Sequence, residues 1–134
     1  MKLHPDAQSS LNTVTAYGDT YIDINTQRFA SSVLVQPEGS IEALALKAFS
    51  EMDELFFEKL AELQPELVIL GTGKKQRFPH PKLTRSLIDQ RIGLESMTTA
   101  AAVRTYNILM AEGRKVVGAF LIEGEITAKT SGSR

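Results

Sequence analysis

The second half of the chain alternates three short apolar runs with two segments of helical character, and this alternation constrains the fold more than any other feature. The apolar runs cover residues 66–70, 92–95 and 115–122, and helices are expected between them over about 82–90 and 98–112. Such alternation is typical of strands that pair in parallel, because each crossover carries a helix back across the sheet. The pattern therefore predicts a parallel β-α-β-α-β unit.

The segment 98–112 has the most regular helical periodicity. Three successive alanines at 100–102 let its first turn approach a sheet closely, and Gly113 suits the position directly after the helix. In the preceding helix, Pro81 is expected in the first turn. At the helical period of 3.6 residues, five side chains of the segment 98–112 fall on one apolar stripe: Ala102, Val103, Tyr106, Leu109 and Met110.

The beginning of the chain has β character. Residues 11–17 and 20–24 are rich in Thr, Val, Tyr and Ile, and Gly18-Asp19 between them suits a two-residue hairpin turn. A second turn is expected near Asn25-Thr26. This part of the chain therefore predicts antiparallel hairpins.

Two further strands and a helix connect the hairpins to the parallel unit. A strand is expected over 32–36, and residues 41–47 fit a strand or a helix, of which the flanking turn residues favour the strand. A helix is expected from Ser50 or Asp53, either of which can cap it, to Pro65. Its core face is formed by Phe56, Phe57, Leu60 and Leu63.

A chain of 134 residues fits one domain with a single core. We expect a flexible N-terminus over residues 1–12, a single α/β domain over 13–123, and a flexible C-terminal tail over 124–134.

The charge is nearly balanced overall but unevenly placed along the chain. The net charge of −1 provides no bulk attraction for nucleic acid or membrane. Residues 38–66 carry eight acidic side chains against two lysines, whereas residues 71–91 carry six basic side chains against Asp89. These opposite charges either face each other within the monomer or mark a docking surface for a protein partner. The basic run has only Phe78 for stacking on bases, so nucleic acid is a disfavoured partner.

Composition also limits the chemistry and the location. The chain has no cysteine, which excludes a disulfide framework, a thiolate nucleophile and cysteine-based metal sites. The two histidines, His4 and His80, are too far apart in sequence to indicate a metal site. The N-terminus lacks an apolar signal core, and the longest apolar run, 116–122, is too short to span a bilayer. A cytoplasmic location without membrane attachment is therefore expected.

Two loops at the ends of predicted strands have the composition of an anion site. Both lie at the carboxyl edge of the sheet if the strands 66–70 and 92–95 are parallel neighbours. Glycine amides can wrap an anion, and the free amides of a helix start can receive one. Neither the P-loop pattern nor the dinucleotide fingerprint is present, so the alternative is a tight glycine turn and an ordinary helix cap. The candidate anion-binding residues are Gly71, Thr72, Gly73, Lys74, Lys75, Arg77, Thr98, Thr99 and Arg104.

Glu95 is the one carboxylate placed for acid–base chemistry, at the end of a predicted strand. A structural ion pair between Glu95 and Arg104 is the favoured interpretation, because a general acid or base needs a positioned partner near its substrate. No Gly-x-Ser-x-Gly signature of a nucleophilic serine occurs. No catalytic residue is therefore assigned, and the chain is expected to be non-catalytic.

Four blocks of sequence, in order, resemble the Mth938-like family, and the resemblance covers about residues 14–123. It implies a compact three-layer α/β fold around a mixed sheet, with N-terminal antiparallel hairpins followed by the β-α-β-α-β unit. The family includes bacterial and archaeal single-domain proteins and a mitochondrial assembly factor for respiratory complex I, and it has no established catalytic residues. This chain departs from the common pattern in having Leu44 in place of tryptophan, Thr98 in place of Asp, and Val103 in place of Cys. The matching blocks are residues 65–73, 93–99, 102–109 and 112–114.

The resemblance implies a non-catalytic binding or assembly factor for a larger protein complex, by analogy one for respiratory complex I. The alternative is a protein or enzyme that takes a small anionic ligand between the 71–77 loop and the 96–99 helix start. No cofactor is expected for a binding or assembly factor, and the sequence leaves the oligomeric state open.

Overall fold

The computed structural model describes residues 11–124, and their secondary structure confirms the predicted order of hairpins followed by a β-α-β-α-β unit. In chain order the elements are β1 (Val14–Tyr17), β2 (Ile22–Ile24), β3 (Gln27–Phe29), β4 (Ser32–Val35), β5 (Glu42–Leu44), the 3₁₀ helix η1 (Phe49–Glu51), α2 (Glu54–Glu62), β6 (Leu67–Gly71), α3 (Arg85–Asp89), β7 (Gly93–Met97), α4 (Thr99–Ala111) and β8 (Val116–Phe120).

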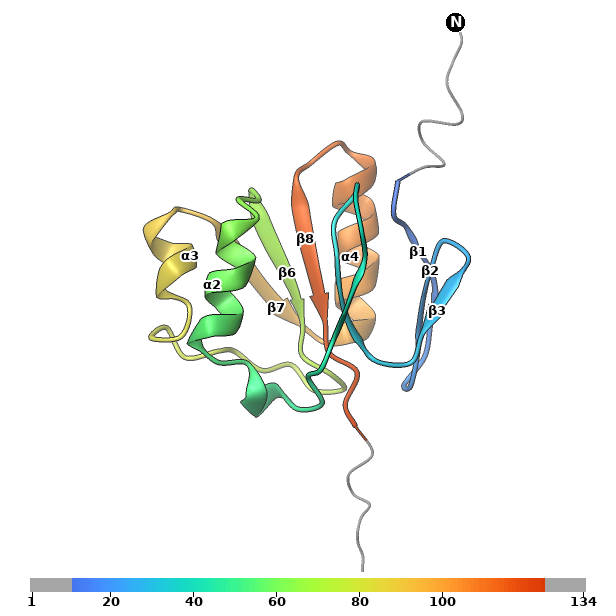
Figure 1. Ribbon diagram of the computed structural model, residues 1–134, viewed down its shortest axis with the longest axis horizontal. Coiled ribbons are helices and arrows are strands. Elements are labelled where there is room, and N and C mark those ends of the chain that lie inside the picture. The colour runs from blue at the N-terminus through green and yellow to red at the C-terminus, as the bar shows by residue number, and fades with distance from the viewer. Residues whose placement is uncertain (1–10, 125–134) are drawn as a thin grey trace, which may run out of the picture.

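The strands form two sheets. The central sheet has the order β5-β4-β8-β6-β7, in which β6 pairs in parallel with β7 and β8, while β4 is antiparallel to β8 and β5 (Figure 1). The first hairpin continues into β3 and forms a separate antiparallel sheet with the order β1-β2-β3. The sheet of the parallel unit is therefore mixed, as the resemblance implies.

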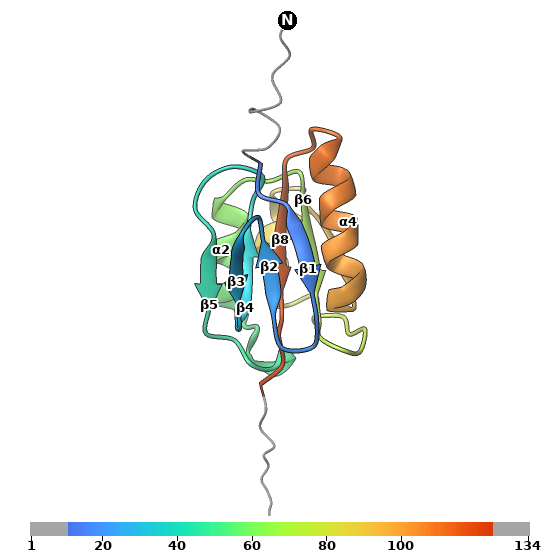
Figure 2. The ribbon, with the colours of Figure 1, turned by 90° about the vertical axis from the view of Figure 1, so that its right-hand side faces the viewer.

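The elements are stacked in three layers. Helices α2 and α3 cover one face of the central sheet, while α4 and the small sheet cover the other face (Figure 2). Alternate residues of the central strands face the two sides, as the period of a β-strand requires. On β8, for example, Val117 and Ala119 belong to the core under α2, and Val116 and Phe120 belong to the core under α4. Both faces of the central strands β4, β6 and β8 are thus buried.

Helix α4 is held on its face of the sheet by the stripe predicted for it. Ala102, Val103, Tyr106 and Met110 are buried, and the rings of Tyr106 and Phe120 meet edge to face at 5.8 Å. The hydroxyl of Tyr106 donates to the carbonyl of Asn12 at 2.8 Å. Burial raises the pKa of the Tyr106 hydroxyl above its ordinary value.

The start of helix α2 is also as predicted. Asp53 caps it by accepting from the N–H of Phe56 at 2.9 Å, and Phe57 and Leu60 are fully buried beneath it. Within residues 11–124, no helix combines the length and the apolar character that crossing a membrane requires.

Some boundaries differ from the predicted ones. Strand β3 was missed because Gln27 and Arg28 lack the apolar alternation of a buried strand, although Asn25, with φ +57°, makes the turn before it. Helix α3 begins at Arg85 and not near residue 82, because residues 80–84 form turns with backbone bonds from Leu83 to His80 and from Thr84 to Pro81. Pro81 therefore precedes the helix, and its predicted place in the first helical turn is wrong.

The predicted limits of the domain also need two corrections, one at each end. Asn12 was assigned to the flexible N-terminus, but it is buried, and its side-chain amide donates to the carbonyls of Gln36 and Gly39. Gly124, assigned to the tail, donates its N–H to the carbonyl of Lys47. The predictions of flexibility for residues 1–10 and 125–134, with His4 among them, lie outside the described residues.

Candidate functional site

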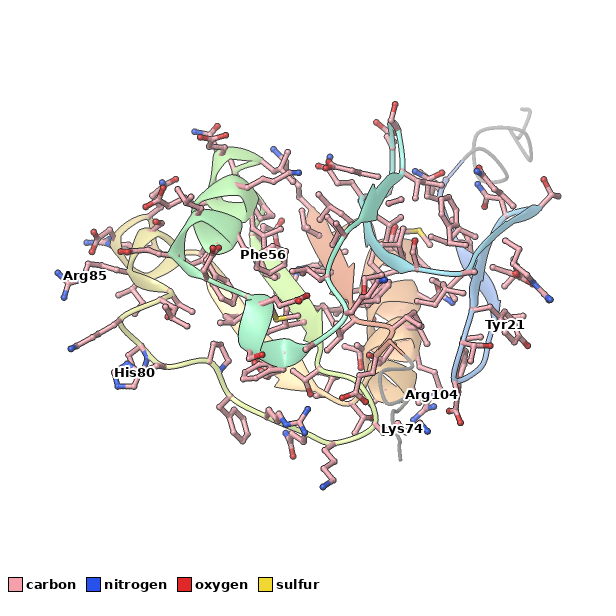
Figure 3. The ribbon with its side chains drawn as sticks, turned by 60° about the horizontal axis from the view of Figure 1, so that its bottom comes forward. Tyr21, Phe56, Lys74, His80, Arg85 and Arg104 are labelled. Atoms are coloured by element: carbon pink, nitrogen blue, oxygen red, sulfur yellow. The ribbon has the colours of Figure 1, made fainter. Side chains whose placement is uncertain are left out.

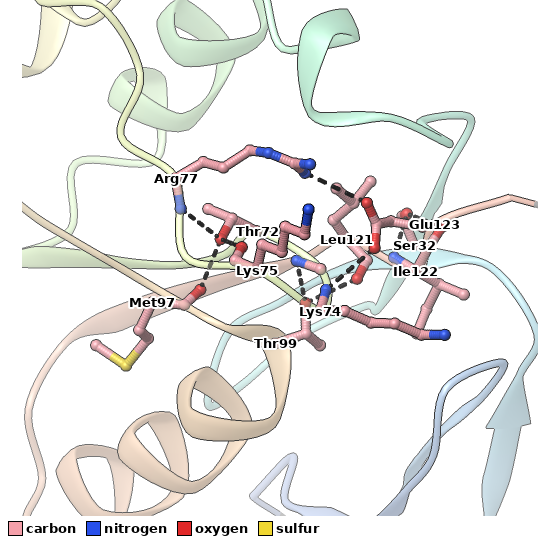
Figure 4. Close-up of polar contacts among 11 residues, drawn as sticks. Ser32, Thr72, Lys74, Lys75, Arg77, Met97, Thr99, Leu121, Ile122 and Glu123 are labelled. Atoms are coloured by element: carbon pink, nitrogen blue, oxygen red, sulfur yellow. Dashed lines mark hydrogen bonds and ion pairs between the residues drawn. The ribbon is translucent and has the colours of Figure 1, made fainter.

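The two loops predicted to share one edge of the sheet lie side by side. Because β6 and β7 are parallel neighbours, the loops that leave them meet at their carboxyl ends. The N–H of Thr72 donates to the carbonyl of Met97 at 2.8 Å. The N–H of Thr99 donates to the carbonyl of Gly73 at 2.9 Å, and the N–H of Gly73 donates to Oγ1 of Thr99 at the same distance (Figure 4). The two loops form one rim, because backbone N–H and carbonyl groups of each loop are hydrogen-bonded to the other.

Thr72 organises the first loop from the inside. Its side chain is fully buried, and its hydroxyl donates to the carbonyl of Lys75 at 2.6 Å and accepts from the N–H of Arg77 at 3.1 Å. These bonds fold residues 72–77 into a closed turn. The hydroxyl of Thr72 is thereby committed to the loop itself.

A carboxylate of the chain occupies the position next to the loop amides where the sequence suggested a bound anion. Glu123 accepts from the N–H of Lys74 at 3.1 Å and forms an ion pair with the guanidinium of Arg77 at 3.3 Å (Figure 4). Its side chain also fills the space beside Gly73, where an added Cβ would lie 2.6 Å from Cδ of Glu123. Gly73 has φ +92°, a conformation that favours glycine. The loop therefore surrounds a carboxylate of the chain itself, that of Glu123.

Thr98 and Thr99 both act at the start of α4, but in different ways. Thr98 is the N-cap and accepts from the N–H of Ala101 at 3.3 Å. Thr99 is buried, and its hydroxyl donates to the carbonyl of Leu121 at 2.7 Å while accepting from Gly73. Gly71 permits this close approach, because a Cβ there would lie 3.0 Å from Cα of Thr99. The helix start is thus tied to both β6 and the exit of β8.

The exit of β8 is itself anchored across the sheet. Ser32 Oγ accepts from the N–H of Ile122 at 2.8 Å and donates to the carbonyl of Leu46 at 2.7 Å. These bonds position Glu123, which follows directly, against the loop.

A cleft of about 270 Å³ opens beside this rim, between the small sheet and the start of α4. Of the predicted residues, Gly73, Lys74, Thr98 and Thr99 line it, whereas Gly71, Thr72, Lys75, Arg77 and Arg104 do not. The other lining residues come from the β1–β2 turn (Tyr17, Gly18 and Asp19), from Ala100, and from residues 121–123.

The cleft is of mixed charge. The ammonium of Lys74 lies 3.6 Å from the carboxylate of Asp19, and Glu123 lies on the same wall. The carboxylates of Asp19 and Glu123 therefore lie close to Lys74 in the cleft. Sequence reasoning missed Asp19 and Glu123, because neither lies within the loops whose glycines and lysines gave the signal.

The predicted ion pair between Glu95 and Arg104 is wrong. It is not among the ion pairs formed by residues 11–124; the guanidinium of Arg104 instead donates to the hydroxyl of Tyr17 at 2.8 Å. The physical reason is the separate small sheet, which brings β1 alongside α4. Asn107, one turn further along, binds the same strand, with bonds of 2.9 and 2.8 Å to the N–H and carbonyl of Val14.

A second surface feature lies on the α2–α3 side of the molecule. Phe78, in the loop between β6 and α3, is 70% exposed, and Ile88 of α3 is 58% exposed. The imidazole of His80 and the guanidinium of Arg85 point outward from this side (Figure 3). In the segment 75–91, four basic side chains take part in no ion pair within the described part of the chain, namely Lys75, Lys82, Arg85 and Arg91.

Comparisons with known proteins agree with the fold. A family model described as "protein of unknown function (DUF498/DUF598)" matches residues 14–121. The crystal structure of a protein from Bordetella parapertussis is 43% identical, with a TM-score of 0.79 over 84% of this chain and 96% of that chain. The solution structure of a Mth938-like domain from Bordetella pertussis is 35% identical, with a TM-score of 0.80, and each chain is covered completely.

Among curated proteins, the chain is similar to "NADH dehydrogenase [ubiquinone] 1 alpha subcomplex assembly factor 3" of Mus musculus. The two are 36% identical over 84 residues, which are 63% of this chain and 42% of the mouse protein. The form from Rattus norvegicus is 28% identical over 123 residues, 89% of this chain and 65% of that protein. The chain thus spans less than two thirds of the length of these curated relatives.

Proposed function

Since this chain belongs to the DUF498/DUF598 family, we propose that it is a non-catalytic protein-binding domain that assists the assembly of a larger protein complex. The mouse and rat relatives of the chain are named as assembly factors for NADH dehydrogenase. By that similarity, respiratory complex I is the first complex to test.

The observation that carries the proposal is the exposed ring of Phe78 in the segment 75–91, where four cations form no ion pair with any of residues 11–124. We define the docking face as Phe78, Ile88 and the four basic side chains Lys75, Lys82, Arg85 and Arg91. A large aromatic side chain exposed to 70% supplies an anchor of the kind that dominates protein interfaces. Cations without carboxylate partners in residues 11–124 favour an acidic partner and accelerate the encounter with it.

The test compares two exposed apolar residues on opposite faces of the molecule. Phe78→Ser removes the anchor from the docking face, and Ile108→Ser removes a side chain of 59% exposure from α4 on the other face. In cells of the source organism, tagged wild-type chain is expected to migrate on native gels with a subcomplex much larger than 14.7 kDa. Phe78→Ser is expected to return the chain to the position of the free protein, and Ile108→Ser is expected to have no effect.

Two results would contradict the proposal. One is a wild-type chain that migrates alone at every stage of growth. The other is equal behaviour of the two variants, because a docking face must distinguish position 78 from position 108.

The second candidate function is binding of a small anionic ligand in the cleft at the rim. It is favoured by Ala100 and Lys74, which both line the cleft, because Ala100 lies in the first turn of α4, where backbone N–H groups can receive an anion. Such a ligand has to compete with the carboxylates of Glu123 and Asp19 for Lys74. Titration with inorganic phosphate, followed by amide resonances, tests it: localised shifts at Gly73, Lys74 and Ala100 support the ligand function, and their absence contradicts it.

The proposal also includes a cytoplasmic location. Fractionation of cells into soluble and membrane fractions tests this part, and recovery of the chain with membranes after disruption of its partner complex would contradict it.

A further inference from the structure

Strand β7 is the last strand of the central sheet and has a neighbour on one side only. The strand order places β6 beside it, and none of the other strands of residues 11–124 lies along its outer edge (Figure 1). An outer edge of this kind presents unpaired N–H and carbonyl groups that can template a further strand.

The hydrogen bonds of β7 show which of its backbone groups face outward. The N–H of Gly93 donates to Glu66 at 3.1 Å, and the carbonyl of Met97 accepts from Thr72 at 2.8 Å, so both residues direct their backbone toward β6. Because the direction alternates along a strand, Leu94 and Ser96 direct theirs outward. This geometry leaves an edge of two residues open to a partner.

One of these outward groups, the carbonyl of Ser96, already accepts a hydrogen bond from a side chain. The side-chain amide of Gln76 donates to the carbonyl of Ser96 at 3.0 Å. That amide occupies the position in which the backbone N–H of an added strand would lie. Because Gln76 is exposed, a peptide can displace its side chain at low cost.

At the edge of β1, by contrast, a side chain of a packed helix occupies the outward backbone groups. There the amide of Asn107 binds both the N–H and the carbonyl of Val14, at 2.9 and 2.8 Å, from a packed helix. Strand β7 contains no proline and no lysine, which are common means of protecting an edge. The contrast indicates that the edge of β7 is left accessible.

The surroundings of the edge specify the chemistry of an added strand. Leu94 packs into the core on the side of α3, which carries Arg85 and is followed by Arg91, so this side of β7 favours acidic and apolar side chains. Glu95 is exposed on the opposite side and disfavours acidic side chains there. The matching sequence therefore alternates, with acidic and apolar residues on one side and neutral residues on the other.

We infer that β7 accepts an extended, acidic segment of the partner protein as a further strand of the central sheet, through the outward backbone groups of Leu94 and Ser96. This inference rests on the proposed function, because it states how the partner binds at the docking face. The added strand displaces the side chain of Gln76 from Ser96 and places its acidic residues on the side of Arg85 and Arg91.

The experiment uses a blocked peptide, acetyl-Glu-Thr-Val-Thr-Glu-Thr-Val-amide, and the same peptide with lysine in place of glutamate. The acidic peptide is expected to shift the amide resonances of Leu94 and Ser96 and to bind more tightly than the basic one. N-methylation of its three threonines and N-methylation of its other residues are then compared. Loss of two backbone bonds should weaken binding about ten-fold or more for one methylated set and leave the other set nearly unchanged.

A matched pair of variants of the protein tests the same edge of β7 without changing the peptide. Ser96→Pro removes the outward N–H and places the proline ring in the path of an added strand, whereas Ser96→Ala keeps the backbone intact. Ser96→Pro is expected to abolish binding of the acidic peptide, and Ser96→Ala to change it less than about two-fold. If Ser96→Pro does not fold, the methylated peptides still decide the question on the wild-type chain.

The outcomes separate this inference from the proposed function. Equal binding by both methylated sets, or shifts confined to Phe78 and Ile88, overturns strand addition while leaving the docking face in place. Dimerisation of the chain that is lost in Ser96→Pro also overturns the inference, because the occupant of the edge is then a second copy. Absence of any binding to β7 by the acidic peptide contradicts it directly.

Discussion

Replacing Thr99 by valine tests whether its hydroxyl is what ties the two rim loops and the exit of β8 together. Valine has nearly the same shape, but it leaves the N–H of Gly73 and the carbonyl of Leu121 without their partner in a buried position. An unsatisfied buried group costs about 1–3 kcal/mol, so the two together should lower the free energy of unfolding by about 2–6 kcal/mol. For a domain of this size, that corresponds to a fall in Tm of about 8–24 °C.

Two control variants make the measurement specific. Thr98→Ala removes only the N-cap bond to Ala101 and should cost about 1 kcal/mol. Thr99→Ser keeps the hydroxyl and should lie within about 1 kcal/mol of the wild type. Thermal and urea unfolding measure all three variants. A loss in Thr99→Val no larger than that in Thr98→Ala would refute the reasoning that the rim is joined through Thr99.

Three further predictions concern the packing and pH dependence of the fold. Gly71→Ala should lower the free energy of unfolding by about 1–3 kcal/mol in urea titrations, because the new Cβ would lie 3.0 Å from the backbone of Thr99; an unchanged midpoint would mean that α4 is not held this closely. Glu123→Ala should cost about 1 kcal/mol or less and accelerate amide exchange at Lys74, whereas unchanged exchange would show that the carboxylate does not hold the loop. Because the pKa of Tyr106 is raised in the folded state, its contribution to stability is complete below pH 10 and is lost as the pH rises above that value. The urea midpoint of the wild type should therefore fall between pH 9 and 11 more steeply than that of Tyr106→Phe, and parallel slopes would contradict the assignment.

The sequence was informative wherever a local pattern determined the structure. The apolar runs around Val68 and Leu94 and the stripe through Tyr106 were enough to predict parallel pairing and the covering helix. Short apolar runs that alternate with helices indicate parallel strands, and a stripe of period 3.6 indicates a helix with one buried face. The meeting of the loops at Gly73 and Thr99 followed from the same pairing. The N-cap residues Asp53 and Thr98 were recognisable from their position before an apolar periodic segment.

The details of the rim depend on contacts between residues that are distant in sequence, and no local sequence pattern indicates such contacts. Glu123 follows the last strand at a distance of 49 residues from Lys74, so no local pattern links the two. Arg104 was paired with the nearest plausible acid, whereas its partner is the hydroxyl of Tyr17, 87 residues away. That error has a physical cause, because the prediction did not include a second sheet that brings β1 to α4.

The claim that the docking face binds a partner protein is tested most directly by photocrosslinking in living cells. A benzophenone amino acid is introduced in place of Phe78 and, in a separate strain, in place of Ile108, both of which are exposed apolar positions. We predict that irradiation joins position 78 to one defined protein, a subunit of an incompletely assembled complex, and that position 108 gives no such product. Crosslinks that form equally from both positions, or from position 108 alone, would contradict the account.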